Sequence, residues 1–224
     1  MPAKVAVRWL FSTAALLLLL LCASSGWSTL EHFRITDSML RSVEERYGRA
    51  GRFRVERWQR LLDQHRQSDI HTMLQAVNRF ANDTVGYASD LEHWGQNDYW
   101  ATPLETLGTG KGDCEDYVIL KYASLRALGV PEERLRLMYV RALSIDEPHM
   151  VLIYFEEPDQ FPLVLDNLTN RILPANERTD LRPVYSFNGQ GLWMARAQGL
   201  GQKVPNSPGV RDWTVLLERI ERGE

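Results

Sequence analysis

A single cysteine in an acidic block could provide a sulfur nucleophile. The block runs from Gly110 to Tyr117 (GKGDCEDY), and an apolar run with helical spacing continues from it to Leu128, where Gly129 and Pro131 form a stop signal. Cys114 is therefore predicted on the first turn of a buried helix. There the unpaired backbone N–H groups and the helix dipole favour thiolate over thiol. A nucleophile needs that setting, and a structural cysteine does not.

Two residues farther along the chain could serve this cysteine as a base and an orienting carboxylate. His149 begins a predicted strand and Asp166 ends the next one, and adjacent antiparallel strands bring such positions together. A thiol nucleophile needs a base within hydrogen-bond reach, and the base needs a third group to hold its tautomer. Cys114, His149 and Asp166 supply these roles in order. Taken singly, His149 could be a surface strand residue and Asp166 a turn residue that caps its strand.

Helical patterns precede the cysteine and strand patterns follow it. Apolar residues recur with helical spacing between residues 26 and 85, and residues 81–112 form a polar, aromatic-containing connection of the length usual for functional loops. After the cysteine helix, the pattern predicts strands over 134–143, 149–155 and 161–165, a hairpin over 184–195 and a short helix over 210–219. The predicted class is α+β, with one domain over 26–224 that is helical over 26–130 and sheet-rich over 131–224.

Composition sets limits on the class of protein. The chain has 224 residues, of which 44% are hydrophobic, enough for one well-buried domain and too few for two large ones. Its net charge of -3 gives no indication of binding to nucleic acid or to an anionic membrane surface.

The first 25 residues predict a secretory signal. Lys4 and Arg8 precede an uncharged apolar stretch over 11–23, and small residues then offer a cleavage site before Gly26. The alternative is a retained membrane anchor, although the stretch is shorter than the roughly 20 residues that span a bilayer comfortably. After cleavage we expect no stable membrane insertion.

Export would leave Cys114 as the sole cysteine, because Cys22 lies in the signal. An oxidising compartment tends to pair cysteines, yet this one has no internal partner. The thiol is then either inert and buried or reactive. The acidic residues that flank Cys114 are unusual beside a cysteine of the hydrophobic core, and they favour the reactive alternative.

Three segments together resemble a known family. The block Gly112–Tyr117 (GDCEDY), the strand start His149–Leu152 (HMVL) and the strand end Val164–Leu168 (VLDNL) are similar to those of the bacterial transglutaminase-like cysteine proteinases of the LapG type. The resemblance extends over most of the mature chain. It implies a papain-like, transglutaminase-like core with Cys114 as nucleophile, His149 as general base and acid, and Asp166 orienting the histidine.

The same resemblance implies a biological role. Proteinases of this type are periplasmic and cut the N-terminal region of a large surface adhesin after paired alanines, which frees cells from a biofilm. Their regulator is an inner-membrane cyclic-di-GMP receptor of the LapD type, whose periplasmic domain sequesters the protease. On the same triad and fold, an acyl transferase of the transglutaminase type and a non-catalytic binding module are the alternatives.

The family also binds calcium, and this chain has matching oxygen ligands. Asp113 and Glu115 flank the nucleophile, and Asn97, Asp98 and Asp116 rank below them as candidates. Calcium takes six to eight oxygens, so other groups would have to complete the shell. By its charge the ion would fix the loop that carries Cys114. The alternative is helix capping, with Asp113 at the N-cap and the other carboxylates favouring the helix dipole.

A tetrahedral oxyanion would need hydrogen-bond donors. The backbone N–H of Cys114 is one donor by the helix-start argument. The fold often adds a group from the upstream loop, for which Trp100 is the first candidate and Trp94 the second. Either indole could instead belong to the core.

Overall fold

The computed structural model describes residues 34–195, 201–207 and 209–224. The predicted signal over 1–25 lies outside these ranges. Across the described ranges, every helix is too short or too polar to span a bilayer.

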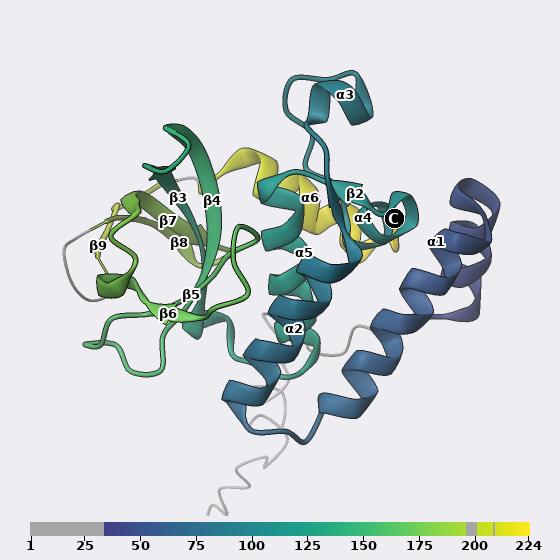
Figure 1. The fold of residues 1–224 in the computed structure, drawn as a ribbon, viewed down its shortest axis with the longest axis horizontal. Helices are drawn as coiled ribbons and strands as arrows, with labels where there is room; N and C mark the ends of the chain where they lie inside the picture. The colour runs from purple at the N-terminus through teal and green to yellow at the C-terminus, as the bar shows by residue number, and fades with distance from the viewer. Residues whose placement is uncertain (1–33, 196–200, 208) are drawn as a thin grey trace, which may run out of the picture.

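Most helices lie in the first half of the described chain and most strands in the second (Figure 1). The α-helices are α1 (Asp37–His65), α2 (Ile70–Thr84), α3 (Asp90–Trp94), α4 (Pro103–Thr109), α5 (Cys114–Ala127) and α6 (Arg211–Glu221). The strands are β1 (Gly86–Tyr87), β2 (Lys111–Gly112), β3 (Leu135–Ala142), β4 (Glu147–Tyr154), β5 (Leu163–Leu165), β6 (Leu173–Pro174), β7 (Leu181–Asn188), β8 (Gly191–Met194) and β9 (Gln202–Lys203). Two short 3₁₀ turns, η2 (Glu132–Arg134) and η3 (Ala175–Glu177), join them.

Seven of the described strands form one antiparallel sheet in the order β6-β5-β4-β3-β7-β8-β9. The long strands β3 and β4 lie near its centre, and β5 pairs with β4 so that Leu152 lies opposite Leu165. The predicted α+β class is confirmed. β1 and β2 form a separate parallel pair that ties the residues after α2 to the residues just before α5.

Helix α5 lies between the sheet and the helices α1 and α2 (Figure 1), and it packs on β4 on one side and on α2 on the other. From Asp116 to Ala127 every residue of α5 is buried, polar ones included. A helix that is buried all round needs apolar residues on every face, as the run after Cys114 provides. The helix ends before Gly129, whose φ of +90° is readily adopted by glycine.

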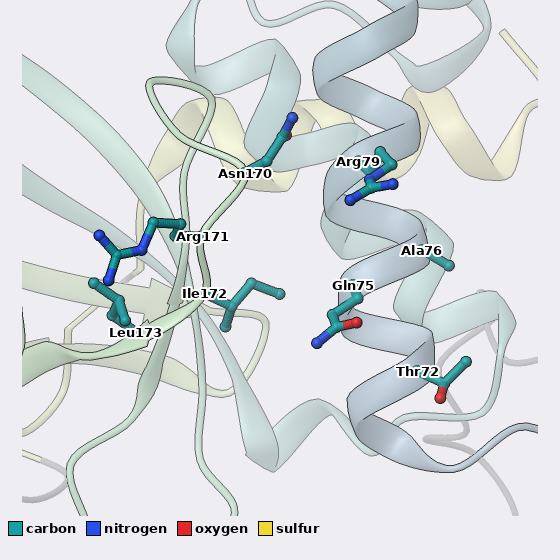
Figure 2. A pocket seen from close by; sticks show the side chains of 8 residues that line it. All are labelled: Thr72, Gln75, Ala76, Arg79, Asn170, Arg171, Ile172 and Leu173. Carbon is teal, nitrogen blue, oxygen red and sulfur yellow. The ribbon is translucent and has the colours of Figure 1, made fainter.

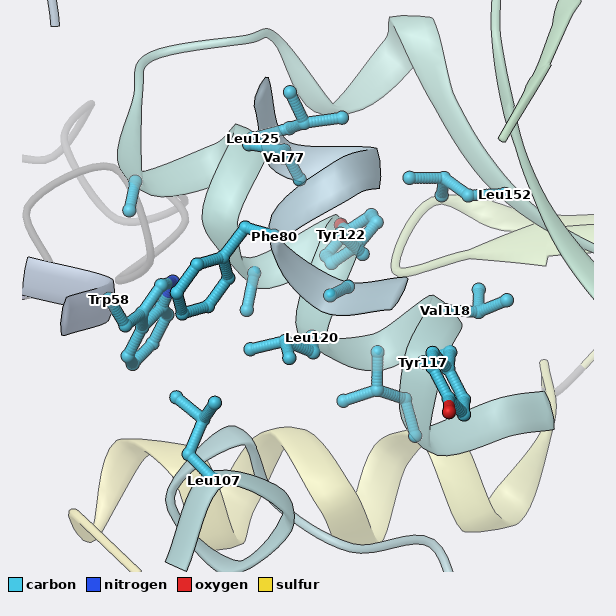
Figure 3. Close-up of a cluster of buried hydrophobic side chains, with 14 of the residues drawn as sticks. Trp58, Val77, Phe80, Leu107, Tyr117, Val118, Leu120, Tyr122, Leu125 and Leu152 are labelled. Atoms are coloured by element: carbon cyan, nitrogen blue, oxygen red, sulfur yellow. The ribbon is translucent and has the colours of Figure 1, made fainter. Parts of the chain in front are cut away.

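Buried aromatic and aliphatic side chains hold α5 against α1 and α2 (Figure 3). The Trp58 side chain of α1 is fully buried, and its indole N–H donates to the Ser124 hydroxyl of α5 at 2.8 Å. Phe80 of α2 and Leu120 of α5 lie beside it in the same cluster. This packing makes α5 a rigid platform for the cysteine at its start.

Residues 81–112 contain more structure than the sequence patterns predict. The connection holds the end of α2, the short helices α3 and α4, and the strands β1 and β2. Thr102 caps α4 in a reciprocal arrangement with Glu105, and Pro103 occupies the first turn. The expectation of a connection without regular structure is therefore wrong for these helices.

Candidate active site

Cys114 is the first residue of α5, so its own backbone N–H has no partner within the helix. Its side chain is half-buried. The thiol donates to Oε2 of Glu115 at 3.0 Å. The sulfur also accepts a hydrogen bond from the backbone N–H of Met150 in β4. The cysteine is thus hydrogen-bonded to Met150, the strand residue that directly follows His149.

His149 and Asp166 lie side by side, as their strand positions predict. Nε2 of His149 is 2.8 Å from Oδ1 of Asp166, and both side chains are buried. Asp166 is ionised, so Nε2 carries the proton and donates it. Nδ1 is then the ring nitrogen with a lone pair, as a base for a thiol requires.

The Asp166 carboxylate is held on both oxygens. Oδ1 also accepts the Leu168 backbone N–H at 3.0 Å, and Oδ2 accepts Nη2 of Arg178 at 2.6 Å. Burial alone would raise the pKa of Asp166, but the hydrogen bonds from His149, Leu168 and Arg178 outweigh it and hold the pKa below its usual range. Asp166 therefore stays a carboxylate throughout the neutral pH range.

The thiol behaves differently from the expectation based on the helix start. Burial raises the pKa of Cys114 well above its ordinary value, and the charge and hydrogen bond of Glu115 raise it further. The Met150 N–H opposes this rise without cancelling it. The prediction that the helix start would by itself favour a thiolate is wrong for the ion-free protein, since burial and an adjacent anion outweigh the dipole.

Three carboxylates converge in front of the thiol. Ligand oxygens of Asp90, Asp113 and Glu115 all lie within 4.8 Å of one another. Asp90 comes from α3, which the β1–β2 pair holds beside the start of α5 through the hydrogen bond from the Ala88 N–H to the Gly112 carbonyl. Segments more than 20 residues apart in the sequence thus form one acidic cluster.

The chemistry of this cluster fits a divalent cation. Oδ1 of Asp90 and Oδ1 of Asp113 are buried and have no hydrogen-bond partner within the described residues. Burial, followed by the charge of Glu115, raises the pKa of Asp113 to about 9, and burial raises that of Asp90 to about 6. Hard oxygen ligands that are desolvated and mutually repulsive are what calcium binds.

The capping alternative is only partly realised. Asp113 occupies the N-cap position of α5, but its side chain makes no capping hydrogen bond. Asp116 instead accepts the backbone N–H groups of Asp113 and, at 2.8 Å, of Ala101. Asp116 thus joins the start of α5 to the loop before α4, a structural task outside the three-carboxylate cluster.

The remaining candidates from the preceding loop lie at the edge of the site. Asn97 and Asp98 are both exposed. Partial burial of its carboxyl raises the pKa of Asp98, the charge of Glu115 raises it further, and a hydrogen bond from the Trp100 indole lowers it.

The two indoles proposed as oxyanion donors have different surroundings. The Trp100 indole faces Asp98, and its ring stacks on Phe187. The indole N–H of Trp94 is buried and has no hydrogen-bond partner in the part of the chain described. The oxyanion role of either indole stays a prediction.

Comparison with known proteins places this arrangement in a family. A model described as bacterial transglutaminase-like cysteine proteinase matches residues 55–193. The chain belongs to this family. The match spans Cys114, His149 and Asp166, and it makes the protein a cysteine protease by descent.

Solved structures agree with this family. Calcium-bound LapG from Legionella pneumophila is 36% identical to this chain with a TM-score of 0.71, covering 83% of this chain and 99% of that one. EGTA-treated LapG from the same organism is also 36% identical, with a TM-score of 0.70 and coverage of 83% and 98%. Among curated proteins, no sequence matches this chain. The predicted transglutaminase-like fold is therefore confirmed.

One groove of this proteinase lies away from the catalytic candidates. It has a volume of about 520 Å³ and runs between α2 and residues 170–173 (Figure 2). Its two arginines do not converge on one point, because Arg171 points away from α2 while Arg79 lies along it. None of its lining residues belongs to the cysteine, histidine and aspartate group.

Two residues of the proteinase site were absent from the sequence prediction. Asp90 joins the acidic cluster, and Arg178 forms an ion pair with Asp166. The only sequence signal at Asp90 is its place in the polar connection, where Asn97 and Asp98 were the preferred candidates. Arg178 carried none, since it is one arginine among many and follows a short 3₁₀ turn.

Proposed function

We propose that this chain is a calcium-dependent, periplasmic cysteine endopeptidase that cuts the N-terminal region of a large surface adhesin, at paired alanines, and thereby promotes biofilm dispersal. The observation that supports the chemistry best is the His149–Asp166 pair, buried and bonded at 2.8 Å beside the strand residue whose N–H contacts the Cys114 sulfur. Membership in the family supports the other parts of the proposal, namely the adhesin substrate, the periplasmic location and control by an inner-membrane cyclic-di-GMP receptor of the LapD type.

The triad carries peptide hydrolysis in two steps. His149 takes the proton of Cys114 at Nδ1, and the sulfur attacks the scissile carbonyl carbon to form a C–S bond while the oxyanion accepts the Cys114 backbone N–H. The C–N bond then breaks as the imidazolium protonates the leaving amine. Water, deprotonated by the same imidazole, hydrolyses the thioester and restores the thiol. Asp166 fixes the ring and stabilises its charged form.

Calcium fits the cluster of Asp90, Asp113 and Glu115, in which Oδ1 of Asp90 and Oδ1 of Asp113 are buried without a partner in the described residues. When bound, the ion supplies positive charge that offsets the carboxylates raising the pKa of the thiol. The LapG of Legionella pneumophila in its calcium-bound form supports this assignment. The chain's own contribution is to hold three ligands from α3 and α5 close together.

The decisive test combines purified protein with the N-terminal fragment of a co-encoded adhesin. With calcium present, we expect two fragments and a new N-terminus after a pair of alanines. EGTA should stop cleavage and added calcium should restore it. Cys114→Ala should abolish cleavage, while the control Arg52→Met, on the remote helix α1, should cut normally. Cleavage by Cys114→Ala would refute the nucleophile assignment.

Acyl transfer would use the same groups, so the assay must separate it from hydrolysis. A labelled primary amine is added to the same mixture. Two fragments without label support hydrolysis, whereas label joined to the new C-terminus identifies a transferase. A non-catalytic binding module would give neither product, and its Cys114 would react with an electrophile no faster than in the unfolded chain.

A further inference from the structure

Arg178 forms a buried bridge between the triad aspartate and a second carboxylate. It follows η3, and its side chain is only 5% exposed. Nη2 is 2.6 Å from Oδ2 of Asp166 and 2.7 Å from Oδ2 of Asp180, while Nε is 2.9 Å from Oδ1 of Asp180. The planar guanidinium thus holds Asp180 with two bonds and Asp166 with a third.

This bridge determines how Asp166 can move. Oδ1 is occupied by His149 and the Leu168 N–H, and Oδ2 by Arg178. Rotation of the carboxylate would break bonds on both oxygens at once. Its backbone is fixed as well, because the Asn82 side chain of α2 donates to the Asp166 carbonyl at 2.9 Å.

The bridge also sets the charge that His149 experiences. The charged groups around the pair are Arg178, the Asp180 carboxylate bonded to it, and the Lys121 amine of α5. Lys121 is fully buried, and its ammonium interacts with Asp166 without a hydrogen bond. Burial lowers the pKa of Lys121 to about 7, with Asp166 opposing the change.

A histidine that acts first as a base and then as an acid needs a moderate affinity for its proton. A buried aspartate with no other cation would hold the imidazolium strongly, and release of the proton to the leaving amine would be slow. A guanidinium on the far oxygen offsets part of that negative charge. It therefore weakens the hold on the proton while keeping the carboxylate ionised and oriented.

We propose that Arg178 is a positioning residue of the proteolytic reaction, which fixes Asp166 and partly neutralises it so that His149 can give up its proton. This inference rests on the proposed function. Arg178 does not touch the substrate or the reacting atoms, and it acts only through Asp166.

The test compares the pH dependence of kcat/KM for cleavage, in saturating calcium, between wild type and Arg178→Met. The acid limb reports protonation of His149, which must be neutral to take the thiol proton. Removal of the cation should move this limb upward by about one pH unit and lower kcat roughly ten-fold. Arg178→Lys, which restores charge, should return the limb to its wild-type position. Arg52→Met is the matched control, since it removes a surface arginine from α1 that is remote from the sheet.

Two further variants keep the test decisive. If Arg178→Met does not fold, as judged by thermal melting, Arg178→Gln replaces it, because an amide can still donate to Asp166 without a charge. The same upward movement is expected. Lys121→Met, measured in parallel, separates the titration of the buried amine from that of His149.

The outcomes distinguish this inference from the proposed function. Lower activity with both limbs unmoved would make Arg178 structural support alone and would overturn the inference. A wild-type protein that cuts nothing, with Cys114 no more reactive than in the unfolded chain, would instead refute the proposed function.

Discussion

Replacing Asp113 by Asn should stabilise the ion-free protein and abolish its response to calcium. A carboxylate oxygen of Asp113 lies within 4.8 Å of carboxylate oxygens of Asp90 and Glu115. Oδ1 of Asp113 is buried and has no hydrogen-bond partner in the described chain. An amide has almost the same shape and carries no charge. The substitution therefore removes repulsion and removes a calcium ligand in one step.

Two calculations give the size of the effect of Asp113→Asn on the free energy of unfolding of the ion-free protein. One pair of unit charges 4.8 Å apart repels by about 3.5 kcal/mol at an effective dielectric constant of about 20. The pKa of Asp113, raised by burial and then by Glu115 to about 9 from an ordinary 3.8, gives about 4 kcal/mol at pH 7 when converted at about 1.4 kcal/mol per unit. Asn still loses hydration on burial, so the expected gain in the free energy of unfolding is about 1–3 kcal/mol, or roughly 3–9 °C in Tm.

The assay is thermal melting in EGTA and in calcium across pH. In EGTA, folded Asp113 binds a proton that the unfolded chain releases between about pH 3.8 and 9, so wild-type stability should fall as pH rises through this window. Asp113→Asn should lose most of this slope, and Asp90 leaves a weaker slope of the same sign near its pKa of about 6. In calcium, wild type should gain Tm and the variant should not.

Asp63→Asn provides the control, because Asp63 is an exposed carboxylate of α1 with one weak contact to Arg66. It should match wild type in both buffers. A lower Tm for Asp113→Asn in EGTA would show that the carboxylate stabilises the helix start rather than straining it. The capping alternative would then replace the calcium site.

Two other substitutions test separate parts of the site. Trp100→Phe should change kcat/KM only a few-fold, because its indole N–H bonds to Asp98; a fall of about 100-fold or more in peptide cleavage would identify Trp100 as an oxyanion donor after all. Trp58→Phe should lower the free energy of unfolding by about 1–3 kcal/mol in urea, since it leaves the buried Ser124 hydroxyl without the indole donor, and it should leave the pH profile of cleavage unchanged.

The helix and strands that carry Cys114, His149 and Asp166 could be predicted because their signals are local. The residues after Cys114 are apolar on every face of a helix, which predicts a helix buried on all sides. Alternation of side chains along the sequence predicts the strands β3 and β4. Antiparallel order then brings His149 to Asp166 without further information. The two-residue strands β6 and β9 are too short to leave a pattern.

The short helices and the long-range ligands were missed for different reasons. Helix α4 did have a local signal, the capping pair of Thr102 and Glu105, which was outweighed by the polar composition around it. Asp90 had none, since its position depends on the two-residue pairing of β1 with β2. Arg178 reaches Asp166 only through the tertiary path of the chain around η3.

The state of the thiol shows the limit of local reasoning most clearly. A helix start does favour an anion, but the effect is confined to about one turn and amounts to about 1 kcal/mol. Burial and the Glu115 carboxylate act at the same atom and raise the pKa of Cys114 instead. Neither the depth of burial nor the direction of Glu115 can be derived from the sequence.

The charges on the two sides of the catalytic candidates are balanced differently. Behind His149, Asp166 is matched by the guanidinium of Arg178. In front of Cys114, by contrast, no lysine or arginine of the described residues forms an ion pair with Asp90, Asp113 or Glu115. The same protein thus neutralises one buried carboxylate with its own cation and leaves three others without one. An external cation at the helix start would offset these charges and make ionisation of the thiol easier, so the charge distribution of the chain supports the proposed calcium requirement.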